Sequence, residues 1–235
     1  MSDRFWAVVP AAGVGKRMAS AVPKQYLPLL GRPLIEQTLS RLLTHPKISG
    51  VFVALSEEDG WWPSTAFADD PRVVRVRGGE ERCHSVLNVL QAMGEQAEEA
   101  DWILVHDAAR PCIHREDLDN LMDQLDDDPV GGLLGVPLHD TVKSVETGER
   151  VVATIPREHL WRAFTPQMFR LGMLRQALSD ALKSGKLVTD DASAMELAGF
   201  QPRMVEGRSD NIKVTCPEDL ALAAFFLDRQ SSADE

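Results

Sequence analysis

The segment from residue 10 to residue 25 combines small residues and cations in an order that suits phosphate binding. It follows a short apolar run and contains Gly13 and Gly15. Arg17 and Lys24 come after the glycines. Small residues let backbone N–H groups approach a phosphate closely, and the two cations add attraction for its charge. The segment is therefore predicted to be a phosphate-binding loop, and a tight turn with exposed basic residues is the simple alternative.

Two common nucleotide-binding loops do not fit this segment. A dinucleotide-binding fingerprint requires a third glycine or an alanine where Met18 stands. A Walker P-loop requires glycine where Pro10 stands and serine or threonine where Arg17 stands. The interpretation that is left is a loop of the kind that holds a nucleoside triphosphate in nucleotidyltransferases.

Apolar runs alternate with helical patterns along most of the chain. Short apolar runs predict strands at 5–9, 51–55, 73–76, 102–105 and 133–136, with further strands near 204–205 and 212–215. Apolar residues at helical spacing predict helices at 34–43, 86–93, 118–125, 168–182 and 192–197, and Pro217 opens a last helix. This alternation predicts an α/β fold with a doubly wound, mostly parallel, Rossmann-like sheet.

Three chemically interesting segments each follow a predicted strand. They are the loop after Val9, the Gly78-Gly79 turn and Asp107. Ligands of such sheets bind beyond the carboxyl ends of the strands, so we expect the three segments at one edge of the sheet. For Asp107 alone, capping a turn is an equal alternative.

The stretch 139–159 interrupts the pattern. Its scattered valines flank Thr147-Gly148-Glu149, a turn signal, which indicates a β-hairpin. The stretch has too few apolar residues for a core of its own, so we expect it to be an arm that projects and packs against a second subunit. The chain, 1–235, is accordingly predicted to be a single domain with a β-arm, and the molecule a homodimer.

Composition excludes several classes of function. A net charge of −11 and a pI near 5.0 disfavour nucleic-acid and anionic membrane surfaces as partners, since both require a basic face. No apolar run approaches the ~20 residues of a membrane span. The three cysteines show no paired spacing, which is typical of free thiols in a reducing compartment. We therefore expect a cytoplasmic protein.

Two possible metal sites carry less weight than their alternatives. Asp190-Asp191 could be a metal pair, but an aspartate at this place more often caps a helix. His106, Cys112 and His114 lie close in sequence, yet their spacing matches no usual zinc pattern. No metal is expected to be held by direct side-chain ligands.

The segment Pro-Ala-Ala-Gly-Val-Gly-Lys-Arg-Met at 10–18, followed by Pro-Lys-Gln-Tyr at 23–26, resembles the signature of sugar and alditol nucleotidyltransferases. It is most similar to the 2-C-methyl-D-erythritol 4-phosphate cytidylyltransferase family. Further matching segments follow in order along nearly the whole chain, at 78–82, 105–111, 140–143, 160–161 with 165–167, 189–193, and 205–207 with 210–215.

The resemblance implies transfer of CMP from CTP to 2-C-methyl-D-erythritol 4-phosphate, with release of pyrophosphate, in the non-mevalonate route to isoprenoid precursors. The residues implied in catalysis are Arg17, Lys24, Arg157 and Lys213. Those implied in CTP binding are Pro10, Ala11, Ala12, Gly13, Gly15, Gly79, Glu80, Ser85 and Ala108. Those implied in binding the acceptor substrate are Asp107, Arg110, Thr141 and Thr165.

The chemistry suits these residues. The attacking phosphate is already ionised, so charge neutralisation and positioning matter more than a general base. Mg²⁺ is the expected cofactor, because it bridges triphosphate oxygens. The alternatives are a ribitol-5-phosphate cytidylyltransferase, an NAD(P)-dependent oxidoreductase, which Met18 disfavours, and a non-catalytic nucleotide sensor, which the number of cations disfavours.

Overall fold

A seven-stranded sheet forms the centre of the molecule. The computed structural model describes residues 4–13, 22–186 and 188–231. In this part of the chain the strand order is β11-β7-β10-β6-β1-β4-β5. The strands are β1 (Phe5–Pro10), β4 (Ile48–Leu55), β5 (Val73–Arg77), β6 (Trp102–Val105), β7 (Gly131–Pro137), β10 (Trp161–Arg170) and β11 (Arg203–Glu206). A small antiparallel pair, β2 (Pro28–Leu29) and β3 (Arg32–Pro33), lies outside this sheet.

Most neighbouring strands of the sheet run parallel. β1 pairs in parallel with both β4 and β6, β4 with β5, and β7 with β11, whereas β10 is antiparallel to β6 and β7. The predicted mostly parallel α/β sheet is thus confirmed. From β1 the chain first builds outward to β4 and β5 and then returns to place β6 on the other side of β1. This reversal leaves a crevice beyond the carboxyl ends of β1 and β6, where open α/β sheets bind their ligands.

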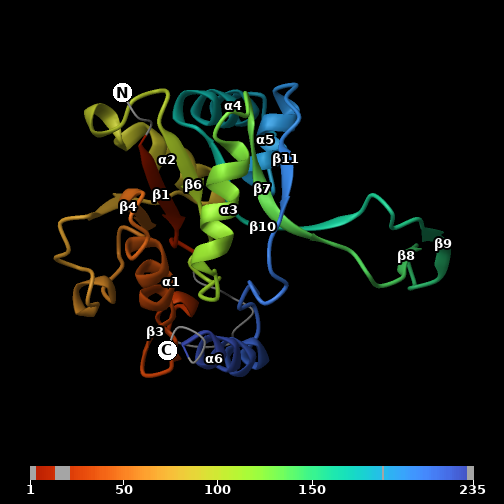
Figure 1. Cartoon of the computed structure of the whole chain (residues 1–235), viewed down its shortest axis with the longest axis horizontal. Coiled ribbons are helices and arrows are strands. Elements are labelled where there is room, and N and C mark those ends of the chain that lie inside the picture. The colour runs from red at the N-terminus through yellow and green to blue at the C-terminus, as the bar shows by residue number, and fades with distance from the viewer. Residues whose placement is uncertain (1–3, 14–21, 187, 232–235) are drawn as a thin grey trace.

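Helices cover both faces of the sheet (Figure 1). The helices are α1 (Leu34–Leu43), α2 (Arg82–Ala92), α3 (Arg115–Leu125), α4 (Leu171–Lys183), α5 (Asp191–Leu197) and α6 (Pro217–Ser231). One buried cluster joins α1 and α3 to the sheet, and a second joins α2, α4 and α5. Because both faces are covered, the β6 residues Trp102 to Val105 are completely buried. Within residues 4–13, 22–186 and 188–231, no helix has the length and apolar character to cross a membrane.

The helix starts near the crevice have local causes in the sequence. Asp190 caps α5: its side chain accepts a hydrogen bond from the Ser193 N–H, and the Ser193 hydroxyl lies near the Asp190 N–H. The capping interpretation of Asp190 is therefore confirmed. At α6, Asp219 accepts from the Thr215 N–H at 2.7 Å, which fixes the chain just before the helix begins.

A two-stranded arm leaves the body between β7 and β10 (Figure 1). β8 (Val142–Val145) and β9 (Val151–Ile155) pair antiparallel with each other and with no strand of the main sheet. Val145, Val151 and Val152 are 55–61% exposed on this hairpin. The arm thus presents apolar side chains to the outside of a single chain.

Two predicted elements differ from the structure. A helix was expected from residue 168, but Met168 lies inside β10, and α4 begins only at Leu171. Met168 is buried in that strand, and apolar residues of a buried strand continue into those of the helix without a break in pattern. The strand expected at 212–215 is wrong. This segment is irregular, since its Val214 N–H donates to the Ala109 carbonyl of a loop and Thr215 to Asp219.

Candidate active site

A cavity opens beyond the carboxyl ends of β1, β5 and β6. Its walls come from the loop after β1, the turn after β5, the start of α2, the loop after β6 and the irregular 208–216 segment. The lining residues are Pro10, Ala11, Ala12, Gly13, Lys24, Gln25, Gly79, Glu80, Glu81, Arg82, Ser85, Asp107, Ala108, Ala109 and Lys213. The three segments expected at one edge of the sheet therefore meet around one cavity.

The loop after β1 is held from two sides. Its Ala11 N–H donates to the Ala54 carbonyl of β4 at 2.8 Å. Its Ala11 carbonyl accepts from Nε2 of Gln25, which is buried, at 2.7 Å. Gln25 was not predicted as a site residue, although it stands beside Lys24 in the matching segment 23–26. It fixes the backbone of the loop relative to Lys24.

The turn after β5 approaches the β1 loop very closely. The Gly78 N–H donates to the Leu55 carbonyl at 2.7 Å, and the Gly79 N–H donates to Oγ of Ser85 at 3.0 Å. A Cβ atom on Gly78 would lie 2.3 Å from Cβ of Ala12. Glycine is thus required at position 78 by space, because two loops of the cavity touch there.

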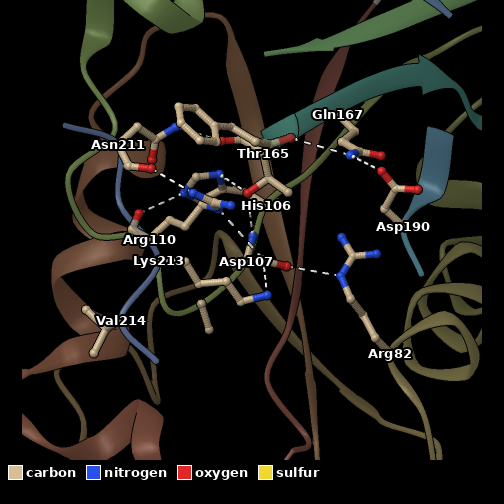
Figure 2. Close-up of polar contacts among 12 residues, drawn as sticks. Arg82, His106, Asp107, Arg110, Thr165, Gln167, Asp190, Asn211, Lys213 and Val214 are labelled. Carbon is tan, nitrogen blue, oxygen red and sulfur yellow. Dashed lines mark hydrogen bonds and ion pairs between the residues drawn. The ribbon is translucent and has the colours of Figure 1, made fainter. Parts of the chain in front are cut away.

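Asp107 is the electrostatic centre of the cavity. Its carboxylate, 10% exposed, accepts from Nζ of Lys213 at 2.7 Å and from Nε of Arg82 at 3.0 Å (Figure 2). Burial alone would raise the pKa of Asp107, but Arg82, Lys213 and Arg110 together lower that pKa well below its ordinary range. The side chain is therefore a carboxylate at physiological pH.

Arg82 connects two acidic side chains and was missed as a site residue. Besides Asp107, its Nη2 donates at 2.8 Å to Asp191, which is completely buried at the start of α5. Burial lowers the pKa of Arg82, but attraction to Asp191 and Asp107 outweighs that effect and raises it, so the guanidinium stays charged. Arg82 could have been predicted, because it follows Gly78-Gly79 closely and belongs to the segment 78–82 that resembles the family.

The irregular 208–216 segment brings the second cation to Asp107. Lys213 lies on it with a side chain 38% exposed. Nζ of Lys24 donates to the Val214 carbonyl of the same segment at 2.9 Å. Two residues expected in catalysis, 189 positions apart in the chain, therefore lie beside the same cavity.

Arg110 and Thr165 lie behind Asp107 and do not line the cavity. Arg110 is 8% exposed, donates from Nη1 to the Asn211 carbonyl at 2.7 Å and covers the Phe164 ring. The Asp107 N–H donates to Oγ1 of Thr165 at 3.1 Å. Both residues thus support Asp107 directly.

The arm carries two further residues that were expected at the site. Thr141 and Arg157 are exposed near its base, and the Arg157 guanidinium donates to the His139 carbonyl. Neither lines the cavity of its own chain. Gly15 and Arg17, which were expected in CTP binding and catalysis, lie outside the described residues.

The residues weighed as zinc ligands have other partners. His106 contacts the Arg110 carbonyl, His114 contacts Asp210, and Cys112 lies near the Ala223 carbonyl. Throughout 4–13, 22–186 and 188–231, no three His, Cys, Asp or Glu side chains come together in a way that could hold a metal ion.

Comparison with known proteins decides the family. The family model described as "IspD: 2-C-methyl-D-erythritol 4-phosphate cytidylyltransferase" matches residues 5–229. The chain belongs to this family. It is 56% identical over 217 residues to the 2-C-methyl-D-erythritol 4-phosphate cytidylyltransferase of Pseudomonas putida strain GB-1, covering 92% of each chain. It is also 56% identical over 224 residues to the protein of that name from Pseudomonas fluorescens strain SBW25, covering 94% of this chain and 95% of the other.

The family's solved structures share the fold. The crystal structure of the Francisella tularensis 2-C-methyl-D-erythritol 4-phosphate cytidylyltransferase superimposes with a TM-score of 0.84 at 35% sequence identity. It covers 95% of this chain and 100% of its own. The family fold therefore extends over nearly the whole of this chain.

The contact between Gly78 and Ala12 gives a test of the cavity. In a Gly78→Ala variant, the new methyl group forces the β1 loop outward, and such overpacking costs about 1–3 kcal/mol. If that cost falls on nucleotide binding, KM for CTP rises roughly 5- to 150-fold. Steady-state kinetics on the folded variant provide the measurement. Gly60→Ala is the matched control, since its Cβ meets nothing within 4 Å. An unchanged KM for CTP in Gly78→Ala would contradict the expectation that this wall of the cavity binds CTP.

Proposed function

We propose that this cavity is where the chain transfers CMP from CTP to 2-C-methyl-D-erythritol 4-phosphate. Membership of the family gives the reaction, which belongs to the non-mevalonate route to isoprenoid precursors. An oxygen of the acceptor phosphate bonds to the α-phosphorus of CTP, and the bond from that phosphorus to the oxygen leading to the β-phosphorus breaks. Pyrophosphate leaves, and 4-diphosphocytidyl-2-C-methyl-D-erythritol is the product. The observation that carries the proposal is the meeting of Lys24, Lys213 and Asp107 around one cavity beyond β1.

In this proposal Arg17, Lys24 and Lys213 stabilise the negative charge that develops on the triphosphate. Two phosphate groups repel each other, so fixed cations lower the barrier chiefly by compensating charge. The proposal is supported by the hydrogen bond from Lys24 to the Val214 carbonyl, which holds the two lysines in adjacent positions. Lys213 also pairs with Asp107, so it stands between the nucleotide and the proposed acceptor site.

The cytosine base is proposed to bind between the β1 loop and the Gly78-Gly79 turn. Residues 10–13, Gly79, Glu80, Ser85 and Ala108 form these walls. Cytosine differs from uracil by an exocyclic amine, which requires a hydrogen-bond acceptor. The carbonyl of Ala11 already accepts from Gln25 at 2.7 Å, whereas the contact of the Gly79 carbonyl with Oγ of Ser85 is longer, at 3.4 Å. The Gly79 carbonyl is therefore the better candidate to recognise the amine.

The acceptor is proposed to bind at Asp107, with Thr165 and Arg110 behind it. A carboxylate accepts hydrogen bonds, so Asp107 suits the hydroxyl groups of the erythritol and repels its phosphate. The phosphate requires cations, and Arg157 with Thr141 is assigned to it. In this proposal both come from the arm of a second subunit, because neither lines the cavity of its own chain. The exposed valines of the arm support such a homodimer.

Mg²⁺ is part of the proposal, as a cation that arrives with CTP. A hard, strongly hydrated cation prefers triphosphate oxygens and water as ligands. Asp107 pairs with Lys213 and Arg82, so its negative charge is already compensated without a metal ion. Bound to the triphosphate, Mg²⁺ would neutralise charge and polarise the α-phosphorus. We place the reaction in the cytoplasm, supported by free thiols at Cys83, Cys112 and Cys216.

The substrates and the metal are tested together by pyrophosphate release from the purified chain. We expect release with CTP and 2-C-methyl-D-erythritol 4-phosphate, little with UTP or with ribitol 5-phosphate, none in EDTA, and full recovery with Mg²⁺. Preference for ribitol 5-phosphate would replace the proposed acceptor. Activity that persists in EDTA would refute the role of Mg²⁺.

The shared site is tested by subunit complementation. Arg157→Ala and Lys24→Ala are each expected to be inactive, but a mixed dimer has one site with both lesions and one with neither. It should recover about half of the normal activity per dimer, because each arm completes the partner's site. Activity is measured after subunit exchange, with mixed dimers quantified by native mass spectrometry.

The matched control pairs Lys24→Ala with Lys213→Ala. Both lysines lie at the cavity of one body, so every site of that mixed dimer keeps one lesion and the mixture should stay inactive. If the Arg157 and Lys24 variants also fail to complement while forming mixed dimers, Arg157 serves its own subunit and the shared site is wrong.

A further inference from the structure

Four hydrogen bonds close a ring behind Asp107 (Figure 2). His106 Nε2 contacts the Arg110 carbonyl at 2.9 Å, and Arg110 Nη1 donates to the Asn211 carbonyl at 2.7 Å. Asn211 Nδ2 donates to the Thr165 carbonyl at 2.8 Å, and Thr165 Oγ1 returns to His106 Nδ1 at 3.0 Å. The ring joins the loop after β6, strand β10 and the irregular 208–216 segment, so it connects the segments that carry Asp107 and Lys213.

All four members of the ring are more than nine-tenths buried. His106 is 0% exposed and Asn211 1%, while Thr165 and Arg110 are 5% and 8% exposed. Water cannot readily replace a lost hydrogen bond at such positions, so each partner is constrained by the others. The direction of each hydrogen bond in the ring is then fixed by which groups can donate.

The contacts of His106 determine its tautomer. The Arg110 carbonyl can only accept, so the hydrogen must lie on Nε2. Burial lowers the pKa of His106 to about 4, so the ring is neutral at pH 7 and Nδ1 carries a lone pair. The Thr165 hydroxyl must therefore donate its hydrogen to Nδ1.

These contacts fix which hydrogen bonds the Thr165 hydroxyl donates and which it accepts. Its hydrogen is used by His106, and one of its lone pairs accepts from the Asp107 N–H at 3.1 Å. One lone pair is left for any further partner. The chain of hydrogen bonds from His106 through Thr165 therefore fixes the backbone of Asp107.

We propose that His106 is a positioning residue that holds the Thr165 hydroxyl as the hydrogen-bond acceptor for the Asp107 N–H, and so holds Asp107 in place for the acceptor substrate. The inference rests on the proposed function, since it assigns the side of the cavity at Asp107 to the acceptor. His106 itself touches no substrate.

The test compares two variants of the full-length enzyme. His106→Phe fills the space without donor or acceptor and should raise KM for 2-C-methyl-D-erythritol 4-phosphate roughly tenfold, while KM for CTP stays within about twofold. His106→Gln keeps one donor and one acceptor and should restore most of the loss. His45→Phe is the matched control: it removes another buried histidine, 2% exposed and paired with Asp119, and should leave both KM values unchanged.

A second comparison asks whether His106 acts through Thr165. Adding Thr165→Val to His106→Phe should raise KM for the acceptor no further than Thr165→Val alone, because one interaction is removed only once. Additive effects, or an equal rise in both KM values, would overturn the positioning role.

The protonation state of His106 can also be measured in the wild-type enzyme by NMR, so this test does not require that a variant folds. In ¹⁵N-labelled protein at pH 7, the His106 imidazole should be neutral with its hydrogen on Nε2. A hydrogen on Nδ1, or a charged ring, would refute the inference. If the wild-type enzyme transfers no CMP, the proposed function fails, and this measurement still decides the state of His106.

Discussion

The buried negative charge of Asp107 is the constraint on which the site depends. A carboxylate taken out of water costs several kcal/mol unless cations and hydrogen bonds compensate it. Here Lys213 and Arg82 lie within 2.7 and 3.0 Å of its two oxygens, and their charges lower its pKa far enough to keep it ionised. The partners come from the 208–216 segment and from the start of α2. A single charge at the end of β6 thus holds together two parts of the chain that the sheet alone does not join.

The compensation extends beyond the first pair of cations. Arg82 continues to Asp191 at the start of α5, while the ring of His106, Arg110, Asn211 and Thr165 fixes the backbone on either side of the carboxylate. Each of these residues makes at least one hydrogen bond, which offsets part of the cost of its burial. In the proposed mechanism, the arrangement holds Lys213 on the side of the cavity that is assigned to the nucleotide. Cations that are held in place in this way would require little reorganisation when charge develops during the transfer.

Most of the fold and the position of the cavity could be predicted from the sequence, for physical reasons. The strands β1, β4, β5 and β6 are short apolar runs because both faces of the sheet are covered, and residues directly after parallel strands must meet at one edge. The cavity residues Ala11, Gly79 and Asp107 followed from that rule. The apolar pattern did not locate the boundary between β10 and α4, because Met168 lies where a buried strand passes into a buried helix and both are apolar.

Side-chain pairs whose two residues are distant in sequence could not be predicted from the sequence. Arg82 lies 25 positions from Asp107 and 109 from Asp191, and His106 lies 59 from Thr165. Nothing local marks such pairs, since they depend on how α2, α5 and β10 pack around β6. The 212–215 segment was predicted to be a strand because its apolar residues alternate. In the structure these residues pack against α6 and the β6 loop, and not in the sheet. The roles of the arm residues Thr141 and Arg157 stay predictions, because they depend on a second subunit.

In the proposed mechanism, the charge of Asp107 holds Lys213 and Arg82 in place for CMP transfer. The most direct measurement is to compare CTP binding by calorimetry with kcat/KM for the acceptor in a folded Asp107→Asn variant. We expect a Kd for CTP within about threefold of the parent, because the walls assigned to the nucleotide are intact. We also expect a kcat/KM lower by at least ~10²-fold, or about 2.7 kcal/mol of transition-state stabilisation. A folded Asp107→Asn enzyme that transfers CMP at close to the normal rate would contradict this mechanism.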